Sequence, residues 1–138
     1  MKKITLNCAH AIVKYLISQK ILINGKKEPL FPGVFGIFGH GNVACLGQAL
    51  EENQKELPTY RGHHEQNMAL TGIGYTRAKR RQQIFVATSS VGPGATNMVT
   101  AAAVAMSNRL PILLLPGDTY ANRMPDPCLL YTSDAADE

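Results

Sequence analysis

Two short segments of this sequence combine residue types that bind ligands. His64-Glu65-Gln66 places an acidic residue where a helix is expected to begin. About two dozen residues later, Thr88-Ser-Ser-Val-Gly-Pro-Gly-Ala-Thr-Asn97 follows an apolar run and leads into a helix of small residues. A strand, a tight turn and a helix start form the region of α/β proteins where ligands bind, outside the carboxyl ends of the strands. Both segments are therefore predicted to face one crevice, and their residues are typical of a cofactor site.

The pair of segments resembles the pyrimidine-binding domain of thiamine diphosphate (ThDP) enzymes of the acetolactate synthase group, where His-Glu-Gln precedes Ser-Gly-Pro-Gly-Ala-Thr-Asn. Three further segments, at 35–43, 113–118 and 121–127, are similar to one branch of this family. That branch hydrolyses a carbon–carbon bond in a cyclic 1,2-diketone derived from myo-inositol. The alternative within the family is a carboligase that joins 2-oxo acids. The alternative from another class is a stand-alone α/β binding module.

The resemblance implies that Glu65 activates the cofactor, through a hydrogen bond between its carboxyl group and N1′ of the aminopyrimidine ring. The other residues implied to bind the cofactor are Thr88, Ser89, Gly92, Pro93, Gly94 and Asn97. The sequence departs from the usual pattern here, since Ser89-Ser90-Val91 stands where one residue normally separates the threonine from Gly-Pro-Gly. Without the second segment, Glu65 would be interpreted as an acid that the helix dipole favours at a helix N-terminus.

Two residues that follow other expected strands, His40 and Asp118, are candidate substrate contacts. A histidine at such a position can bind hydroxyl groups or transfer protons near neutral pH. An aspartate can accept hydrogen bonds from a polyol. Each residue also has a simpler interpretation, in which it shapes its own turn, and both interpretations stay open.

The segments that hold the diphosphate and Mg²⁺ in this family belong to a separate, later domain, which is marked by Gly-Asp-Gly. This sequence contains no Gly-Asp-Gly. In the family, the pyrimidine domain of one subunit completes the site with the diphosphate domain of another. The resemblance therefore implies ThDP and Mg²⁺ as cofactors, a second subunit in a homodimer or homotetramer, and no metal ligand within this chain. The chain alone is expected to be inactive.

The last eleven residues, 128–138, do not fit the pattern and look like the translation of a sequencing adapter, so we expect one domain over residues 1–127 of an incomplete protein. The net charge is +4, and it would be +7 without the three acids of this tail.

The densest basic cluster, at 77–81, lacks interleaved aromatic residues and is interpreted as a solvated helix end rather than a nucleic-acid surface. The absence of a signal peptide or long apolar run, together with scattered cysteines, indicates a cytoplasmic protein.

Strands that alternate with helices predict an α/β fold with a parallel sheet flanked by helices. The chain is expected to open with an amphipathic helix capped by Thr5, followed by an Asn24-Gly25 turn and an exposed loop at 26–29. Strands are expected at 34–38, 59–61, 84–88 and 112–115, the last buried on both faces. Helices are expected at 43–52, with Asn42 as the cap, at 65–79 and at 95–108.

Overall fold

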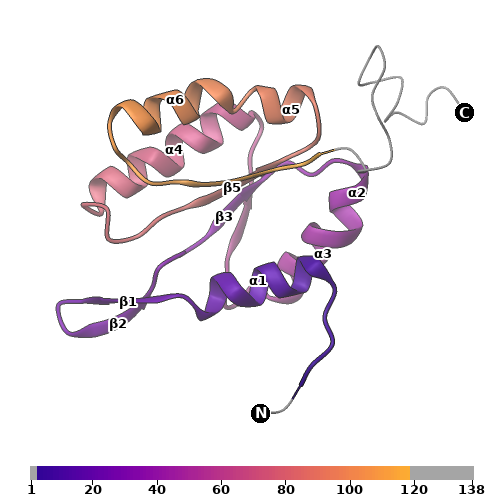
Figure 1. Ribbon diagram of the computed structural model, residues 1–138, viewed down its shortest axis with the longest axis horizontal. Helices are drawn as coiled ribbons and strands as arrows, with labels where there is room; N and C mark the ends of the chain where they lie inside the picture. Colours follow the sequence, from indigo (N-terminus) through magenta and orange to yellow (C-terminus); the bar gives the residue numbers. More distant parts are fainter. Residues whose placement is uncertain (1–2, 119–138) are drawn as a thin grey trace, which may run out of the picture.

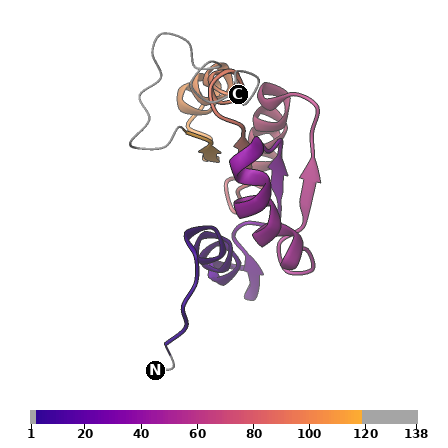
Figure 2. The ribbon, with the colours of Figure 1, turned by 90° about the vertical axis from the view of Figure 1, so that its right-hand side faces the viewer.

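The computed structural model describes residues 3–118, so the segments 121–127 and 128–138 interpreted above lie outside the described residues. Its centre is a parallel sheet of four strands in the order β4-β3-β5-β6. The strands are β3 (Val34–Gly36), β4 (Thr59–Arg61), β5 (Val86–Ser89) and β6 (Leu113–Pro116). Figures 1 and 2 both place α4 (Glu65–Ala78) and α6 (Val99–Ser107) on one face of the sheet and α1 (Cys8–Ser18) toward the other. The predicted α/β fold is confirmed.

Each face of the sheet has its own hydrophobic core, because successive strand residues point to opposite faces. Val86 belongs to the core beneath α1 and α3 (Gln48–Glu52), whereas the next residue, Ala87, belongs to the core beneath α4 and α6. The helix residues of the second core are mostly small or branched: Ala69, Ile73, Ala101 and Ala105. The result is a three-layer arrangement, with the sheet between α1 and α3 on one face and α4 and α6 on the other.

The connections between strands change direction between β3 and β5. From β3 the chain passes to β4 on one side, through α2 (His40–Asn42), the π-helical turn η1 (Val43–Gly47) and α3. From β5 it passes to β6 on the other side, through α5 (Pro93–Thr96) and α6. In open α/β sheets, ligands bind outside the carboxyl ends of the strands at such a switch point. The topology therefore places a candidate site next to the ends of β3 and β5.

The amino-terminal part departs from the expectation in two places. Asn7 caps α1, since its Oδ1 accepts a hydrogen bond of 2.8 Å from the backbone N–H of His10, so the prediction of Thr5 as the cap is wrong. The segment expected as a loop at 26–29 is a strand, β2 (Lys26–Pro29), which pairs antiparallel with β1 (Lys20–Ile23). Asn24 and Gly25 form the predicted turn with φ of +49° and +78°, values typical of a two-residue hairpin loop.

Two expected helices also differ in detail. The helix after β3 begins at His40 rather than Val43, with Gly39 as the cap, so Asn42 lies inside it. The helix expected at 95–108 consists of α5 and α6, with Asn97 at the end of α5. Within residues 3–118, no helix has the length and hydropathy needed to cross a membrane.

Strand β6 is only half-buried, and its last residue, Pro116, is exposed. It pairs with β5 alone among the described strands, so one of its edges is open in the described part of the sheet. The prediction that this strand is buried on both faces is therefore wrong for the described residues.

Candidate functional site

Three loops meet at the carboxyl edge of the sheet, around Ser90 and Val91. A methyl group on Gly39, which follows β3, would lie 3.0 Å from Ser90 Cβ. The backbone N–H of Gly117, which follows β6, donates a hydrogen bond of 3.0 Å to the carbonyl of Ser89, and a methyl group there would lie 2.9 Å from the backbone nitrogen of Val91. A Cβ atom would have to displace backbone atoms at Gly117 and push the Ser90 side chain aside at Gly39, so the loops after β3, β5 and β6 pack closely together.

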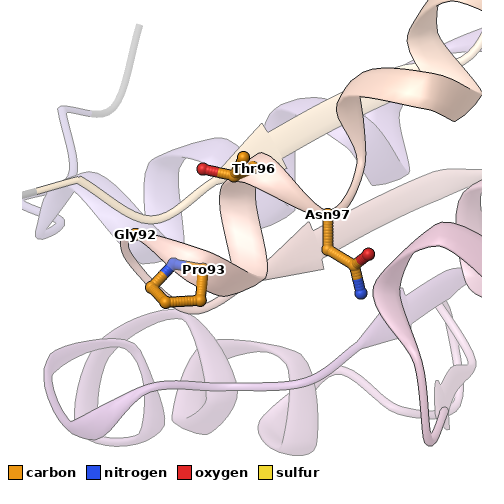
Figure 3. Close-up of a pocket in the computed structure, with 4 residues that line it drawn as sticks. All are labelled: Gly92, Pro93, Thr96 and Asn97. Atoms are coloured by element: carbon orange, nitrogen blue, oxygen red, sulfur yellow. The ribbon is translucent and has the colours of Figure 1, made fainter.

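Glu65 is the first residue of α4, and His64 caps that helix. The carboxyl group reaches α5, where Oε2 accepts a hydrogen bond of 2.9 Å from Asn97 Nδ2. Figure 3 shows the Asn97 side chain projecting from the end of α5 in a different direction from Thr96. Among the described residues, the other oxygen, Oε1, has no recorded hydrogen-bond partner. The two sequence segments therefore meet as predicted, with one carboxylate oxygen held by the protein and the other available.

The turn between β5 and α5 depends on glycine for two reasons. Gly92 has φ +68° and ψ −116°, a backbone conformation that residues with a side chain rarely adopt. A methyl group on Gly94 would lie 3.1 Å from Glu65 Oε1 and still closer to Ser90 Oγ. The missing side chain thus lets the Glu65 carboxyl group and the Ser90 hydroxyl group approach the backbone of α5 closely.

A shallow hollow of about 860 Å³ lies at the same turn. Gly92, Pro93, Thr96 and Asn97 line it (Figure 3). Asn97 therefore belongs both to the wall of this hollow and to the hydrogen bond with Glu65. The site combines an open surface with a carboxyl group, an amide group and exposed backbone.

Thr88 and Ser89 lie beneath this site rather than on its surface. Both are fully buried. Thr88 Oγ1 donates a hydrogen bond of 2.8 Å to the carbonyl of Leu115 in β6, and Ser89 Oγ donates one of 3.0 Å to the carbonyl of Ser90. Their hydroxyl groups support the sheet edge, so the structure does not bring them together with Glu65, and their contacts with a cofactor stay predictions.

His40 and Asp118 occupy two of the three converging loops, and both are exposed. His40 begins α2 directly after Gly39, and Asp118 follows Gly117. The close packing of these glycines against residues 89–91 places both loops at the edge of the sheet that carries Glu65. Their contacts with a substrate stay predictions.

Three residues of the site, His64, Ser90 and Thr96, lie in the two segments but were not predicted as cofactor contacts, and His64 was interpreted only as a pocket-edge or interface residue. The Nε2 atom of His64 lies 3.3 Å from Asn97 Nδ2, a contact between residues 33 positions apart that no local pattern encodes. Thr96 could have been found, because it lies three residues after Pro93 and so shares a helix face with it. Residues 3–118 contain no group of three or more histidine, cysteine, aspartate or glutamate side chains arranged to hold a metal ion.

Comparison with known proteins identifies the family to which this chain belongs. Residues 30–126 match the family model described as thiamine pyrophosphate enzyme, N-terminal TPP binding domain. The chain is 54% identical over 129 residues to 3D-(3,5/4)-trihydroxycyclohexane-1,2-dione hydrolase of Geobacillus thermodenitrificans (strain NG80-2), and 50% identical over 129 residues to that of Clostridium tetani (strain Massachusetts / E88). Each match covers 94% of this chain and 20% of the relative, so the chain spans about one fifth of the length of these curated relatives. The chain belongs to the thiamine pyrophosphate enzyme family, of which it carries the N-terminal TPP binding domain.

Proposed function

We propose that this chain supplies the pyrimidine side of the ThDP site in an enzyme that hydrolyses 3D-(3,5/4)-trihydroxycyclohexane-1,2-dione. The observation that carries the proposal is the meeting of Glu65, Gly94 and Asn97 at the switch point of the sheet. The relatives that are about half identical to this chain are named for that hydrolysis. We further propose a role in the breakdown of inositol, which the resemblance of the sequence implies, and we expect the enzyme to act in the cytoplasm.

The residues at the site fit an aminopyrimidine ring. The ring is flat and carries nitrogen atoms at its edge, so it needs a close backbone approach and a carboxyl oxygen that is not already bonded. Gly94 supplies the first, since it adds no side chain between the backbone of α5 and the Glu65 carboxyl group. Oε1 of Glu65 supplies the second, while Asn97 holds Oε2.

When bound, ThDP supplies the nucleophilic carbon for cleaving a bond next to a carbonyl group. The contribution of this chain is to hold a proton between Glu65 Oε1 and the ring nitrogen N1′. The bond from Asn97 to Oε2 keeps the carboxyl group in one rotamer, with Oε1 beside Gly94. Such fixed orientation lowers the entropic cost of bringing the reacting groups together.

The diphosphate group and Mg²⁺ are expected to bind to residues outside this chain. A second subunit is expected to cover the pyrimidine side. The surface of α6 supports this expectation, since Val99 and Met106 are 62% and 84% exposed on a helix built almost entirely of apolar residues. Exposed apolar helix faces mark contacts with another protein surface.

The experiment is to determine the gene sequence beyond the codon for Pro127 and to assay the full-length product on the cyclic dione and on pyruvate. We expect a long open frame that carries Gly-Asp-Gly, and hydrolysis of the dione that depends on ThDP and Mg²⁺. Condensation of pyruvate without hydrolysis of the dione would instead identify an acetolactate synthase-type carboligase. A frame that ends after Glu138 in native DNA would favour a stand-alone binding module and refute the proposal.

A further inference from the structure

The helices α4 and α6 end beside each other at the edge of the sheet opposite Glu65. Figure 1 shows the turns that follow both helices at one end of the molecule, away from α5. An α-helix rises about 1.5 Å per residue, so the 14 residues of α4 separate this end from Glu65 by about 20 Å. The two helix ends therefore form a surface that is distinct from the candidate cofactor site.

A hollow of about 320 Å³ lies between these helix ends. Three arginines from the end of α4 line it together with two residues from the end of α6: Arg77, Arg80, Arg81, Asn108 and Leu110. All three arginines are exposed. Arg81 Nη2 donates a hydrogen bond of 3.4 Å to the backbone carbonyl of Asn108, and this bond joins the turn after α4 to the turn after α6. The hollow is thus built by both helices and is surrounded by three positive charges.

Both helices end in the same hydrogen-bonded motif. After α4, the backbone N–H of Arg81 donates a hydrogen bond of 2.9 Å to the carbonyl of Thr76. After α6, the backbone N–H of Leu110 donates one of 2.9 Å to the carbonyl of Ala105. In this motif the residue before the donor adopts the left-handed conformation, and glycine is the usual residue at that position.

Arginine stands at the left-handed position in both motifs. Arg80 and Arg109 each have φ of +52°, and Arg81 follows with φ of +65°. The left-handed conformation brings the Cβ atom of an ordinary residue too close to a backbone carbonyl, a strain that glycine avoids. Strained residues of this kind cluster at ligand sites. Since Arg80 and Arg81 also line the hollow, the fold keeps arginine there against the local backbone preference.

The arginines of the hollow have few partners in the described part of the chain. Among residues 3–118, none of the three forms an ion pair, and the side chains of Arg77 and Arg80 form no hydrogen bond. Basic side chains often bond the last carbonyl groups of a helix. Here the carbonyl groups of Thr76, Arg77 and Lys79 already accept backbone N–H groups. The guanidinium groups are therefore available to a ligand.

We propose that this hollow binds the phosphate group of a small molecule, either inorganic phosphate or a phosphate ester. A guanidinium group presents its N–H donors in a planar fork that matches the oxygens of a phosphate group, and three such groups outweigh its two negative charges. The volume corresponds to about ten water molecules, which suits a phosphate group with a small organic part. The lining contains no aromatic side chain on which a base could stack, so the hollow does not suit a nucleic acid. The proposal is independent of the reaction that the enzyme catalyses.

The test is a ³¹P NMR titration of the full-length product of the gene near neutral pH, with ThDP and Mg²⁺ in excess so that the diphosphate site is filled. The probes are inorganic phosphate and glycerol 3-phosphate, at an ionic strength held constant with sodium chloride. We expect saturable binding of at least one probe with a Kd of about 1 mM or lower. Tighter binding of glycerol 3-phosphate would support an ester as the ligand, and tighter binding of inorganic phosphate would support the free ion.

Arg80→Gly and Arg109→Gly form a matched pair of variants. Each removes one positive charge and one left-handed arginine, but of these two residues only Arg80 lines the hollow. We expect Arg80→Gly to weaken binding about fivefold or more, because charge-assisted hydrogen bonds to the phosphate group are lost. Arg109→Gly should weaken binding less than about twofold, because only a charge screened by salt is lost. Both variants of the 138-residue chain should have a higher urea midpoint than the parent without phosphate, since glycine relieves the strain.

Arg77→Gln is a second variant, which leaves the turn unchanged and should also weaken binding about fivefold or more. Absence of saturable binding by the full-length product would overturn the proposal, as would parent-like affinity in Arg77→Gln. Equal losses of affinity in Arg80→Gly and Arg109→Gly would refute it, since net charge alone would then attract the anion. Binding by the 138-residue chain but not by a longer full-length product would refute it too, because the hollow would then be an internal contact of the enzyme. A lower urea midpoint in Arg80→Gly would also count against it, since arginine would then stabilise the turn itself.

Discussion

Gly94→Ala tests whether the space beside Glu65 is as tight as the structure shows. The added methyl group would lie 3.1 Å from Glu65 Oε1 and closer still to Ser90 Oγ. Ordinary contacts between such atoms lie at about 3.5–4.0 Å, so the Ser90 side chain must rotate and the Glu65 carboxyl group must shift by a few tenths of an ångström. Overpacking of this kind costs about 1–3 kcal/mol. Alanine recovers about 0.5–1 kcal/mol of backbone entropy in a helix, so we expect a net loss of about 0–2.5 kcal/mol.

The assay is urea unfolding of the 138-residue chain, followed by circular dichroism. Gly74→Ala is the matched control, because Gly74 lies inside α4, is exposed, and has nothing within 4 Å of an added methyl group. That variant should be more stable than the parent by about 0.5–1 kcal/mol. Equal gains in stability from both substitutions would refute the close approach of Gly94 to Glu65 and Ser90. In a chimera in which residues 1–127 of this chain replace the matching segment of the Geobacillus relative, Gly94→Ala should also weaken ThDP binding, since the methyl group would displace the Glu65 carboxyl group that is proposed to bond the ring.

Three further predictions concern the scaffold and use the same unfolding assay. Asn7→Ala should destabilise the chain by about 0.5–2 kcal/mol, because it removes the cap of α1; an unchanged urea midpoint would contradict that cap. Thr88→Val should cost about 1–3 kcal/mol through a lost buried hydrogen bond, whereas Thr76→Val should be neutral or stabilising, since the buried Thr76 hydroxyl group has no hydrogen-bond partner among residues 3–118; the reverse order would contradict these assignments. The hydrogen bond from His10 is the main cause of the lowered pKa of Glu52, so the stabilisation from this carboxylate is present at neutral pH and is lost as the pH falls through the lowered pKa. Glu52→Gln should therefore reduce the loss of stability in acid, and an identical acid profile would count against the pair.

The parts of the fold that sequence predicts well are those fixed by local patterns. The Gly92–Gly94 turn and the helix start at Glu65 are encoded by glycine, proline and an acid at defined positions, and the structure brings them together. The hairpin of β1 and β2 was missed because its strands are short and half exposed, although Asn24-Gly25 signalled the turn.

The parts that sequence could not predict depend on long-range geometry. The hydroxyl group of Thr88 donates a hydrogen bond to Leu115 in β6, and the direction of this side chain follows from strand register, which no local pattern gives. The contact of His64 with Asn97 joins residues from two helices that only the packed sheet brings together. Side-chain roles at the site therefore require the structure, whereas the location of the site does not.

The central claim is that Glu65 binds the aminopyrimidine ring of ThDP, and the most direct measurement is the Kd of the chimera for ThDP with Glu65→Gln. Glutamine keeps the shape of the side chain and can still accept the Asn97 hydrogen bond, but it cannot share a proton through Oε1. The account predicts that this variant loses hydrolysis of the dione by about 100-fold or more and binds ThDP less tightly, since proton transfer by a positioned side chain typically contributes factors of about 10²–10⁴. Glu56→Gln, at an exposed glutamate outside the site, should leave both values unchanged. Parent-like affinity and activity in Glu65→Gln would contradict the account.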